Sequence, residues 1–199
     1  MAFFSAKNAG LAFMIAAIIS IISAIIVVAG YMDNVAYGVV LAIGAIIGAL
    51  LYFMYGNKVR TGAISEKIEI LAQFVKIVGV VTIIDGIFTG IAPLLNNAGA
   101  DFVALIGGII LGLIIIFIST KINDGKQTTG DKLIWIILLI AFVICLILAI
   151  LAIVGGCALL VVSILGGIGV IIGGICDLII YSFMILMLTD SEVKSEMGI

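Results

Sequence analysis

The longest apolar stretch of the chain runs from Leu133 to Leu188 and reads LIWIILLIAFVICLILAILAIVGGCALLVVSILGGIGVIIGGICDLIIYSFMILML. Its 56 residues include a single charge, Asp177. A helix crosses the hydrocarbon core of a bilayer in about 20 residues. The stretch is therefore too long for one span and barely long enough for three, and we expect two membrane helices that turn near Gly155 and Gly156.

The rest of the chain has the same apolar character. Of its 199 residues, 65% are hydrophobic and only 10% are charged, with a mean hydropathy of +1.53. Soluble domains are about 45–50% apolar and about 25% charged, and a soluble fold of this length could not hide so much apolar surface. The apolar runs are continuous rather than alternating, which favours helices over a barrel. The sequence thus predicts an all-α polytopic membrane protein.

Charged and turn residues divide the chain into six spans, which we expect to form a single transmembrane domain over residues 1–199. The first apolar run, Leu11 to Gly30, exceeds the ~7–15 residues of a signal-peptide core, so it is interpreted as a span. Pro93 stops the third span because proline cannot continue a hydrogen-bonded helix. The predicted spans are about residues 10–30, 36–55, 70–92, 102–119, 133–154 and 160–188.

The positive charges predict the orientation. Six spans place both termini and the second and fourth loops on one side of the membrane. The nine Lys and Arg residues all belong to that side, except Lys76, which lies within the third span. The positive-inside rule makes this side cytoplasmic. We expect a multi-pass protein of the plasma membrane with both termini in the cytoplasm. The net charge of −2 argues against a nucleic-acid partner.

Glycine pairs four residues apart recur along the chain at offsets of 64 and 61 residues. This period suggests three helical hairpins of one ancestral kind, all running in the same direction. Residues four apart share a helix face, so each pair offers a groove for another helix. We expect close packing within the bundle, or contact with a second copy or a membrane partner; the alternative is chance among 24 glycines. The pairs are Gly44/Gly48, Gly108/Gly112 and Gly169/Gly173, with Gly86/Gly90 as a fourth.

The second hairpin carries a family resemblance. It reads GVVTIIDGIF at residues 79–88, then Pro93, then LIGGIILG at residues 105–112. It resembles the unit repeated in the HdeD-like membrane family, whose members have about this length and six spans in three hairpins. The resemblance covers most of the chain and implies a role in bacterial acid resistance, with no catalytic residues to carry over. The first and third hairpins lack the proline before the outer turn.

Three ionisable residues lie within the predicted spans, namely Lys76, Asp85 and Asp177. Each costs roughly 2.5–3.5 kcal/mol on membrane-insertion scales. Lys76 lies near the cytoplasmic side, where a long side chain can reach the headgroups. Alternatively, Lys76 forms an ion pair with Asp177, at similar depth, that sets the register of the third span against the sixth.

Asp85 lies ~20 Å from the cytoplasmic end of the third span, at a rise of ~1.5 Å per residue. Thr82 and Thr89 share its helix face. Three interpretations stay open: proton or cation handling in a small polar pocket, a hydrogen-bonded aspartate that joins helices, and an aspartate that faces outer water.

The residues of common catalytic sites are missing. The chain has no histidine, no phosphate-binding glycine loop and no HExxH pattern, and its three cysteines lack CxxC spacing. We expect no catalytic residues, no metal and no cofactor. Trp135 and Tyr181 are predicted as interfacial anchors, and residues 190–196 as a solvated tail.

The leading prediction is a non-enzymatic membrane protein in contact with lipid, and the resemblance implies a role in envelope or acid stress. One alternative is a small transporter or channel for protons, cations or small apolar solutes. Another is a subunit that packs against a larger membrane complex through its glycine faces.

Overall fold

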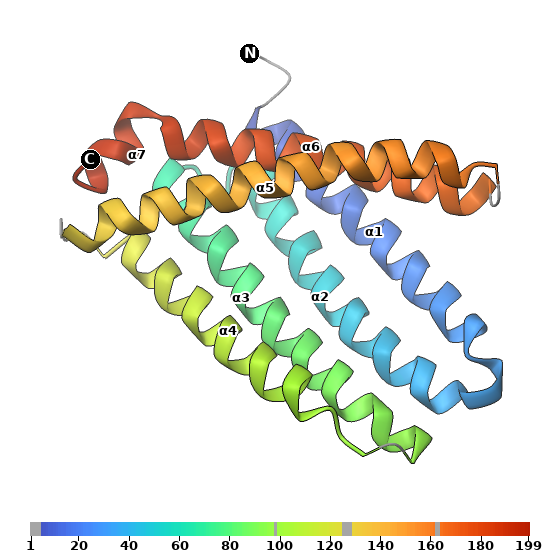
Figure 1. The fold of residues 1–199 in the computed structure, drawn as a ribbon. Coiled ribbons are helices and arrows are strands. Elements are labelled where there is room, and N and C mark those ends of the chain that lie inside the picture. Colours follow the sequence, from blue (N-terminus) through green and yellow to red (C-terminus); the bar gives the residue numbers. More distant parts are fainter. Residues whose placement is uncertain (1–4, 98, 125–128, 162–163) are drawn as a thin grey trace.

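Helices account for nearly all of the chain in the computed structural model, which describes residues 5–97, 99–124, 129–161 and 164–199 (Figure 1). Six of the described helices are long and apolar enough to cross a membrane. The predicted class, an all-α polytopic membrane protein, is therefore confirmed. The helices are α1 (Ala6–Gly30), α2 (Val35–Thr61), α3 (Lys67–Ile91), α4 (Phe102–Ile122), α5 (Thr129–Leu159), α6 (Ile164–Thr189) and α7 (Ser191–Glu196), with 3₁₀ turns at Met32–Asn34 (η2) and Ala92–Asn96 (η3).

Short polar side chains start the helices where the sequence turns. The side chain of Asn34 accepts a hydrogen bond from the backbone N–H of Tyr37 at the start of α2. Asp101 accepts from the backbone N–H groups of Val103 and Ala104 at the start of α4. These bonds satisfy amides that have no partner inside the helix. Pro93 follows the end of α3 and lies in η3, where its missing N–H costs nothing.

The turn of the third hairpin differs from the prediction. Helix α5 continues through Gly155 and Gly156 to Leu159, so the chain turns only after that residue. Gly156 serves close packing instead, because a Cβ on it would lie 2.7 Å from the Ile171 side chain. In a bilayer an unwound segment finds no water for its backbone groups, and a helix that continues through Gly155 and Gly156 satisfies those groups internally.

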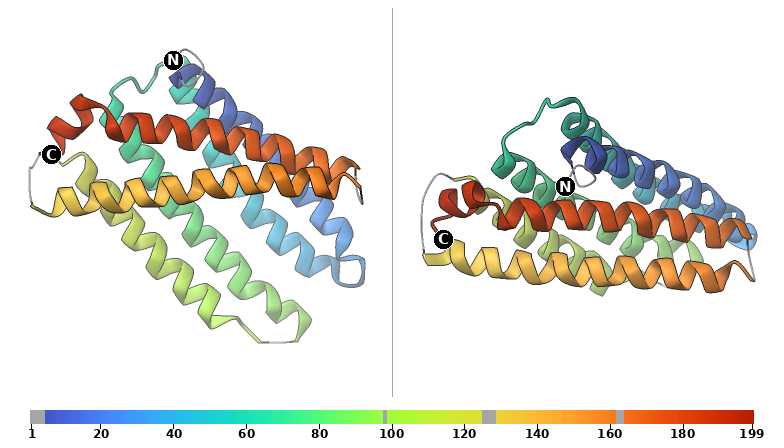
Figure 2. Two further views of the ribbon diagram at one scale, coloured as in Figure 1. Left: turned by 45° about the horizontal axis from the view of Figure 1, so that its top comes forward. Right: turned by 90° about the horizontal axis from the view of Figure 1, so that it is seen from above.

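The six long helices pair as three hairpins, α1–α2, α3–α4 and α5–α6, in which each helix packs along its successor. Helix α2 also packs on α3, so the first two hairpins form one layer in the order α1, α2, α3, α4 (Figure 1). The third hairpin crosses one face of this layer, with α6 against α1 (Figure 2). This crossing brings α6 over the inner helices of the layer near the end where α3 begins.

Glycines allow the closest helix contacts of the layer. A Cβ on Gly86 would lie 2.7 Å from the Cα of Gly108, and a Cβ on Gly112 would lie 2.5 Å from the carbonyl oxygen of Gly79. A Cβ on Gly90 would lie 2.6 Å from the Leu105 Cβ. Helices α3 and α4 thus meet backbone to backbone, as small residues permit in membranes.

The glycine pair of α2 faces the next hairpin rather than its own. A Cβ on Gly44 would lie 2.8 Å from the Phe88 Cβ, and one on Gly48 would lie 3.1 Å from the Val81 side chain. Both neighbours belong to α3. This pair therefore joins the first hairpin to the second.

The pair Gly169/Gly173 receives no other helix of the described chain, so packing within the bundle, the first of the two predicted roles, does not apply to it. A Cβ at either position would meet nothing within 4 Å. Gly174 is the glycine of α6 that packs against Ile153 and Ala149 of α5, and Gly167 packs against Leu160, just after α5 ends; both lie on a different face of α6. The face with Gly169 and Gly173 is open to lipid or to another chain.

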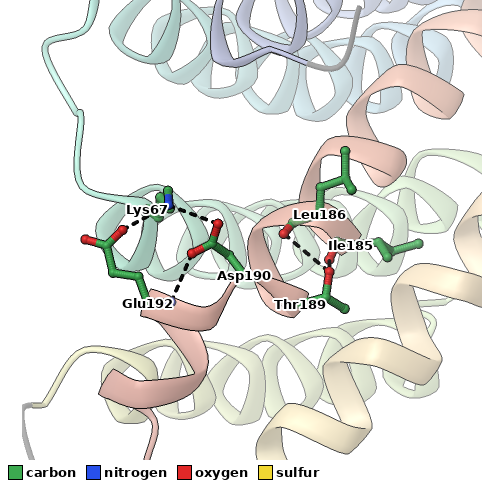
Figure 3. A network of polar contacts seen from close by, with 6 residues as sticks. All are labelled: Lys67, Ile185, Leu186, Thr189, Asp190 and Glu192. Carbon is green, nitrogen blue, oxygen red and sulfur yellow. Dashed lines mark hydrogen bonds and ion pairs between the residues drawn. The ribbon is translucent and has the colours of Figure 1, made fainter. Parts of the chain in front are cut away.

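The C-terminal tail packs onto the bundle and is not the solvated end that its charges predict. Val193 is 0% exposed and Met197 is 2% exposed. Lys67 at the start of α3 forms ion pairs of 2.9 Å with both Asp190 and Glu192, as Figure 3 shows. The ammonium group of Lys67, and then the backbone N–H of Glu192, hold the pKa of Asp190 below its usual range. We call these three residues the tail latch.

Candidate functional site: a cavity at Asp177

A cavity of about 160 Å³ lies where the third hairpin crosses the layer. Its walls come from α1, α2, α3 and α6, so all three hairpins contribute. The polar side chains in the wall are those of Asp177, Ser20, Tyr52 and Tyr181. The remaining lining residues are Phe13, Ala16, Ala17, Phe74 and Ile180.

The cavity reaches the middle of the spans. Asp177 lies near the midpoint of α6 (Ile164–Thr189), and Ser20 lies in the central part of α1 (Ala6–Gly30). Phe13 and Phe74 lie nearer the end where α1 and α3 begin. The site thus extends from that end toward the centre of the membrane, where an ionisable group is costly.

Aromatic rings build the walls. Phe13 stacks on Tyr52 with ring centroids 6.2 Å apart and an interplanar angle of 8°. The Phe74 ring lies 5.4 Å from that of Phe13 and 6.4 Å from that of Tyr181, the latter edge to face. Offset and edge-to-face arrangements are the favourable ones for such rings. Phe74 of α3 therefore connects the ring of α1 to the ring of α6 across the hairpins.

A buried hydrogen bond fixes Tyr55, which packs beside the rings that line the cavity. The Tyr55 hydroxyl donates to the backbone carbonyl of Ile70 at 2.8 Å, which joins α2 to α3. Tyr55 is 1% exposed and packs edge to face on Phe13. A phenol buried in this way needs a partner for its O–H, and the bond fixes the position of the rings that wall the cavity.

The expected ion pair between Lys76 and Asp177 does not form among the described residues. Lys76 is exposed, whereas Phe74 of the same helix lines the cavity. Two residues correspond to about 200° around a helix of 3.6 residues per turn. Lys76 therefore points away from the face of α3 that meets α6. Its exposed position fits a side chain that extends to the headgroups.

Asp85 lies outside the cavity. Asp85 and Thr89 are exposed on α3, and Thr82 is half-buried with its hydroxyl donating to the Val78 carbonyl at 2.8 Å. The three share one helix face, as predicted, and none of them lines the Asp177 cavity. A small polar pocket was one of the three interpretations of Asp85, and the polar cavity described above lies at Asp177 instead. The other two interpretations of Asp85 stay predictions.

The two predicted anchors have different places. The indole N–H of Trp135 donates to the Leu188 carbonyl at 2.8 Å, and the Lys194 ammonium lies 5.4 Å from the centre of its ring. Trp135 therefore ties α5 to the end of α6 and to α7. Tyr181 is not an interfacial anchor, because its ring lines the cavity beside Asp177.

Sequence reasoning missed four aromatic residues of this cluster, namely Phe13, Tyr52, Tyr55 and Phe74. A signal was present, because Tyr52 and Tyr55 lie three residues apart within an apolar span and so share a face. Tyrosines at that depth need polar partners. Their position therefore predicts that this face of α2 packs against other helices of the bundle and does not contact lipid.

Nothing in the described part of the chain gathers three or more residues of the metal-binding types. Cys145, Cys157 and Cys176 are free thiols. Apart from Asp177, the cavity wall offers only hydroxyl groups and apolar side chains. The arrangement can hold a positive charge beside one carboxylate.

The fold and the site together define a polytopic membrane protein with a polar cavity that is lined by residues of three helical hairpins. Comparison with protein-family models, with curated proteins and with solved structures finds no match to this chain. The resemblance to the HdeD-like family stays a prediction, and so does the acid-resistance role that it implies.

Proposed function

We propose that this protein is a small non-enzymatic carrier of the plasma membrane that binds a positively charged solute at Asp177. The observation that carries the proposal is the cavity itself, in which a carboxylate at mid-span is walled by helices of all three hairpins. Ionisable residues within spans are costly, and those that face a cavity mark substrate and ion pathways.

The way in which the hairpins meet supports a carrier over an open channel. The two helices of the third hairpin, α5 and α6, pack closely on each other. The third hairpin contacts the other two hairpins mainly where α6 packs on α1. A tilt of α6 against the layer would change access to Asp177 while each hairpin stays intact. Such rocking of one bundle against another around a central site is the usual basis of alternating access. The small cavity, about 160 Å³, disfavours a wide aqueous pore.

The test is charge movement in liposomes that contain the purified full-length chain. Protons, K⁺ and tetramethylammonium are supplied in turn, and the current or internal charge is recorded. We expect Asp177→Asn to abolish the movement of whichever cation is carried. Asp85→Asn is the matched control, since it removes an exposed carboxylate from a neighbouring helix, and it should leave the movement unchanged. Equal activity of Asp177→Asn and the unmodified chain would overturn the proposal.

The proposed orientation places both termini in the cytoplasm, because the basic loops share that side. Single cysteines at Ala63 and Leu95, in a background without the natural thiols, test it. Both positions are exposed and lie in opposite sets of loops. A maleimide that cannot cross membranes should label Leu95→Cys in intact cells and Ala63→Cys only after lysis. The reverse pattern would contradict the orientation.

A further inference from the structure

We propose that the Asp177 cavity accepts a small organic ammonium ion, of the size of tetramethylammonium or choline, in preference to a metal cation. This inference rests on the proposed carrier function and adds the chemical class of the solute. It follows from the composition of the wall, from the charge of the site and from the size of the cavity.

The wall has too few oxygen atoms for a bare metal ion. Ca²⁺ in proteins takes about six to eight oxygen ligands, and K⁺ in a channel filter exchanges its hydration shell for a ring of carbonyl oxygens. Here one carboxylate, on Asp177, is accompanied by the hydroxyl groups of Ser20, Tyr52 and Tyr181, and every other lining side chain is apolar. An alkylated ammonium ion has no such requirement, because its charge is spread over methyl groups that accept apolar contact.

The aromatic rings supply the contact that such an ion prefers. The faces of Phe and Tyr rings attract cations, and cages of such rings recognise quaternary ammonium groups. Phe13, Tyr52, Phe74 and Tyr181 all line the cavity. Phe13 and Tyr52 are nearly parallel, whereas Phe74 and Tyr181 meet edge to face, so the rings present surfaces in more than one direction.

The carboxylate of Asp177 also favours a cation as the ligand. None of the ion pairs among the described residues includes Asp177. The intramembrane cation that could have neutralised it, Lys76, is exposed on another face of α3. A carboxylate at this depth gains most from a counter-ion that sheds its water easily, and quaternary ammonium ions carry no N–H groups that must stay hydrogen-bonded.

The volume limits the size of the solute. Sites for drug-sized molecules measure about 300–1,000 Å³, and this cavity measures about 160 Å³. The space suits an ion with a handful of heavy atoms. Tetrabutylammonium, which carries the same charge on longer chains, should therefore be excluded.

The experiment is calorimetric titration of the full-length chain in lipid nanodiscs. The probes are tetramethylammonium, choline, K⁺, tetrabutylammonium and 3,3-dimethylbutanol, which is the uncharged isostere of choline. We expect binding of the first two and no binding of the others. Asp177→Asn should weaken tetramethylammonium binding at least about tenfold, the loss that corresponds to roughly 1.4 kcal/mol. Asp85→Asn should bind as the unmodified chain does.

A second pair of variants tests the ring wall separately from the charge. Tyr52→Phe keeps the ring and should retain binding within about twofold. Tyr52→Leu removes the ring and should weaken binding severalfold. Helical content and thermal unfolding of each variant show whether it folds, and a variant that binds weakly although folded supports the site.

The outcomes separate the two proposals. Equal binding of choline and its uncharged isostere, or equal loss in the two Tyr52 variants, would overturn the inference of an ammonium site. If protons or K⁺ still move in an Asp177-dependent way while tetramethylammonium neither binds nor moves, the inference fails and the carrier function stands. If no cation moves or binds in an Asp177-dependent way, both fail.

Discussion

Replacing Gly108 by alanine tests whether α3 and α4 are held by direct backbone contact. A Cβ on Gly108 would lie 2.5 Å from the Cα of Gly86, and 3.2 Å from both the Gly86 nitrogen and the Thr82 carbonyl oxygen. These are backbone atoms, so no side-chain rotation can relieve the overlap. Carbon atoms pack at ~3.5–4.0 Å, so the two helices must separate by about 1 Å at this crossing.

The cost follows from that separation. A gap of ~0.5–1 Å forfeits about a quarter to a half of the attraction at each contact, and overpacking in cores typically costs about 1–3 kcal/mol. Alanine recovers about 1 kcal/mol of helix propensity relative to glycine. Gly107→Ala is the matched control, because it makes the same chemical change in the same helix where a Cβ meets nothing within 4 Å.

The propensity gain is common to both variants, so their difference reports packing alone. We expect Gly108→Ala to be less stable than Gly107→Ala by about 1–3 kcal/mol. Unfolding in mixed micelles, followed by far-ultraviolet circular dichroism as the denaturing detergent is increased, measures this difference. Equal stability of the two variants would refute the backbone contact between α3 and α4.

Three further predictions concern the hydrogen bond at the base of the cavity, the tail latch and the exposed lysine. Tyr55→Phe removes the hydrogen bond to the Ile70 carbonyl and should lower the free energy of unfolding by about 0.5–1.5 kcal/mol in the same assay; no change would show that the bond is dispensable. Because the pKa of Asp190 is lowered in the folded chain, the ion pair between Lys67 and Asp190 should contribute its full stability above the ordinary aspartate pKa of about 4, and this contribution should be lost as the pH falls through the lower folded value. Trp135, the single tryptophan of the chain, should report this loss as a fluorescence change that Asp190→Asn removes, and an acid transition that persists in that variant would contradict the assignment. Lys76→Gln should change stability by less than about 0.5 kcal/mol, as for other exposed positions, whereas a large loss would revive the ion pair that the structure lacks.

The number and kind of the spans follow from local features of the sequence. Pro93 and the cap Asp101 mark the turn of the second hairpin, and both are in the expected places. A segment of about 20 apolar residues is stable as a helix in lipid by itself, because it satisfies its own backbone hydrogen bonds. Each span can therefore be predicted without knowledge of the others. The error at this turn arose because a glycine can also serve a helix contact, as Gly156 does against Ile171, and such a contact depends on a second helix.

The candidate site could be predicted only in part. Asp177 and Asp85 were both conspicuous as charges within apolar runs, and nothing local distinguished them. The structure separates them because α6 crosses the layer beside Phe74, which places Asp177 in the wall of the cavity, whereas Asp85 stays exposed on α3. Tyr52 of α2 became part of the site for the same reason.

The sequence by itself determined that the chain crosses a membrane as six apolar helices joined by short turns. The tertiary structure alone decided which glycine faces meet, where the third hairpin lies, and which aspartate lines a cavity. The reason is that lipid surrounds every span with a solvent as apolar as its own side chains. No apolar stripe is needed to drive the helices together, so their contacts depend on shape and on a few polar groups. Complementary shape is a property of two helices in contact, so it cannot be predicted from the hydropathy of either segment alone.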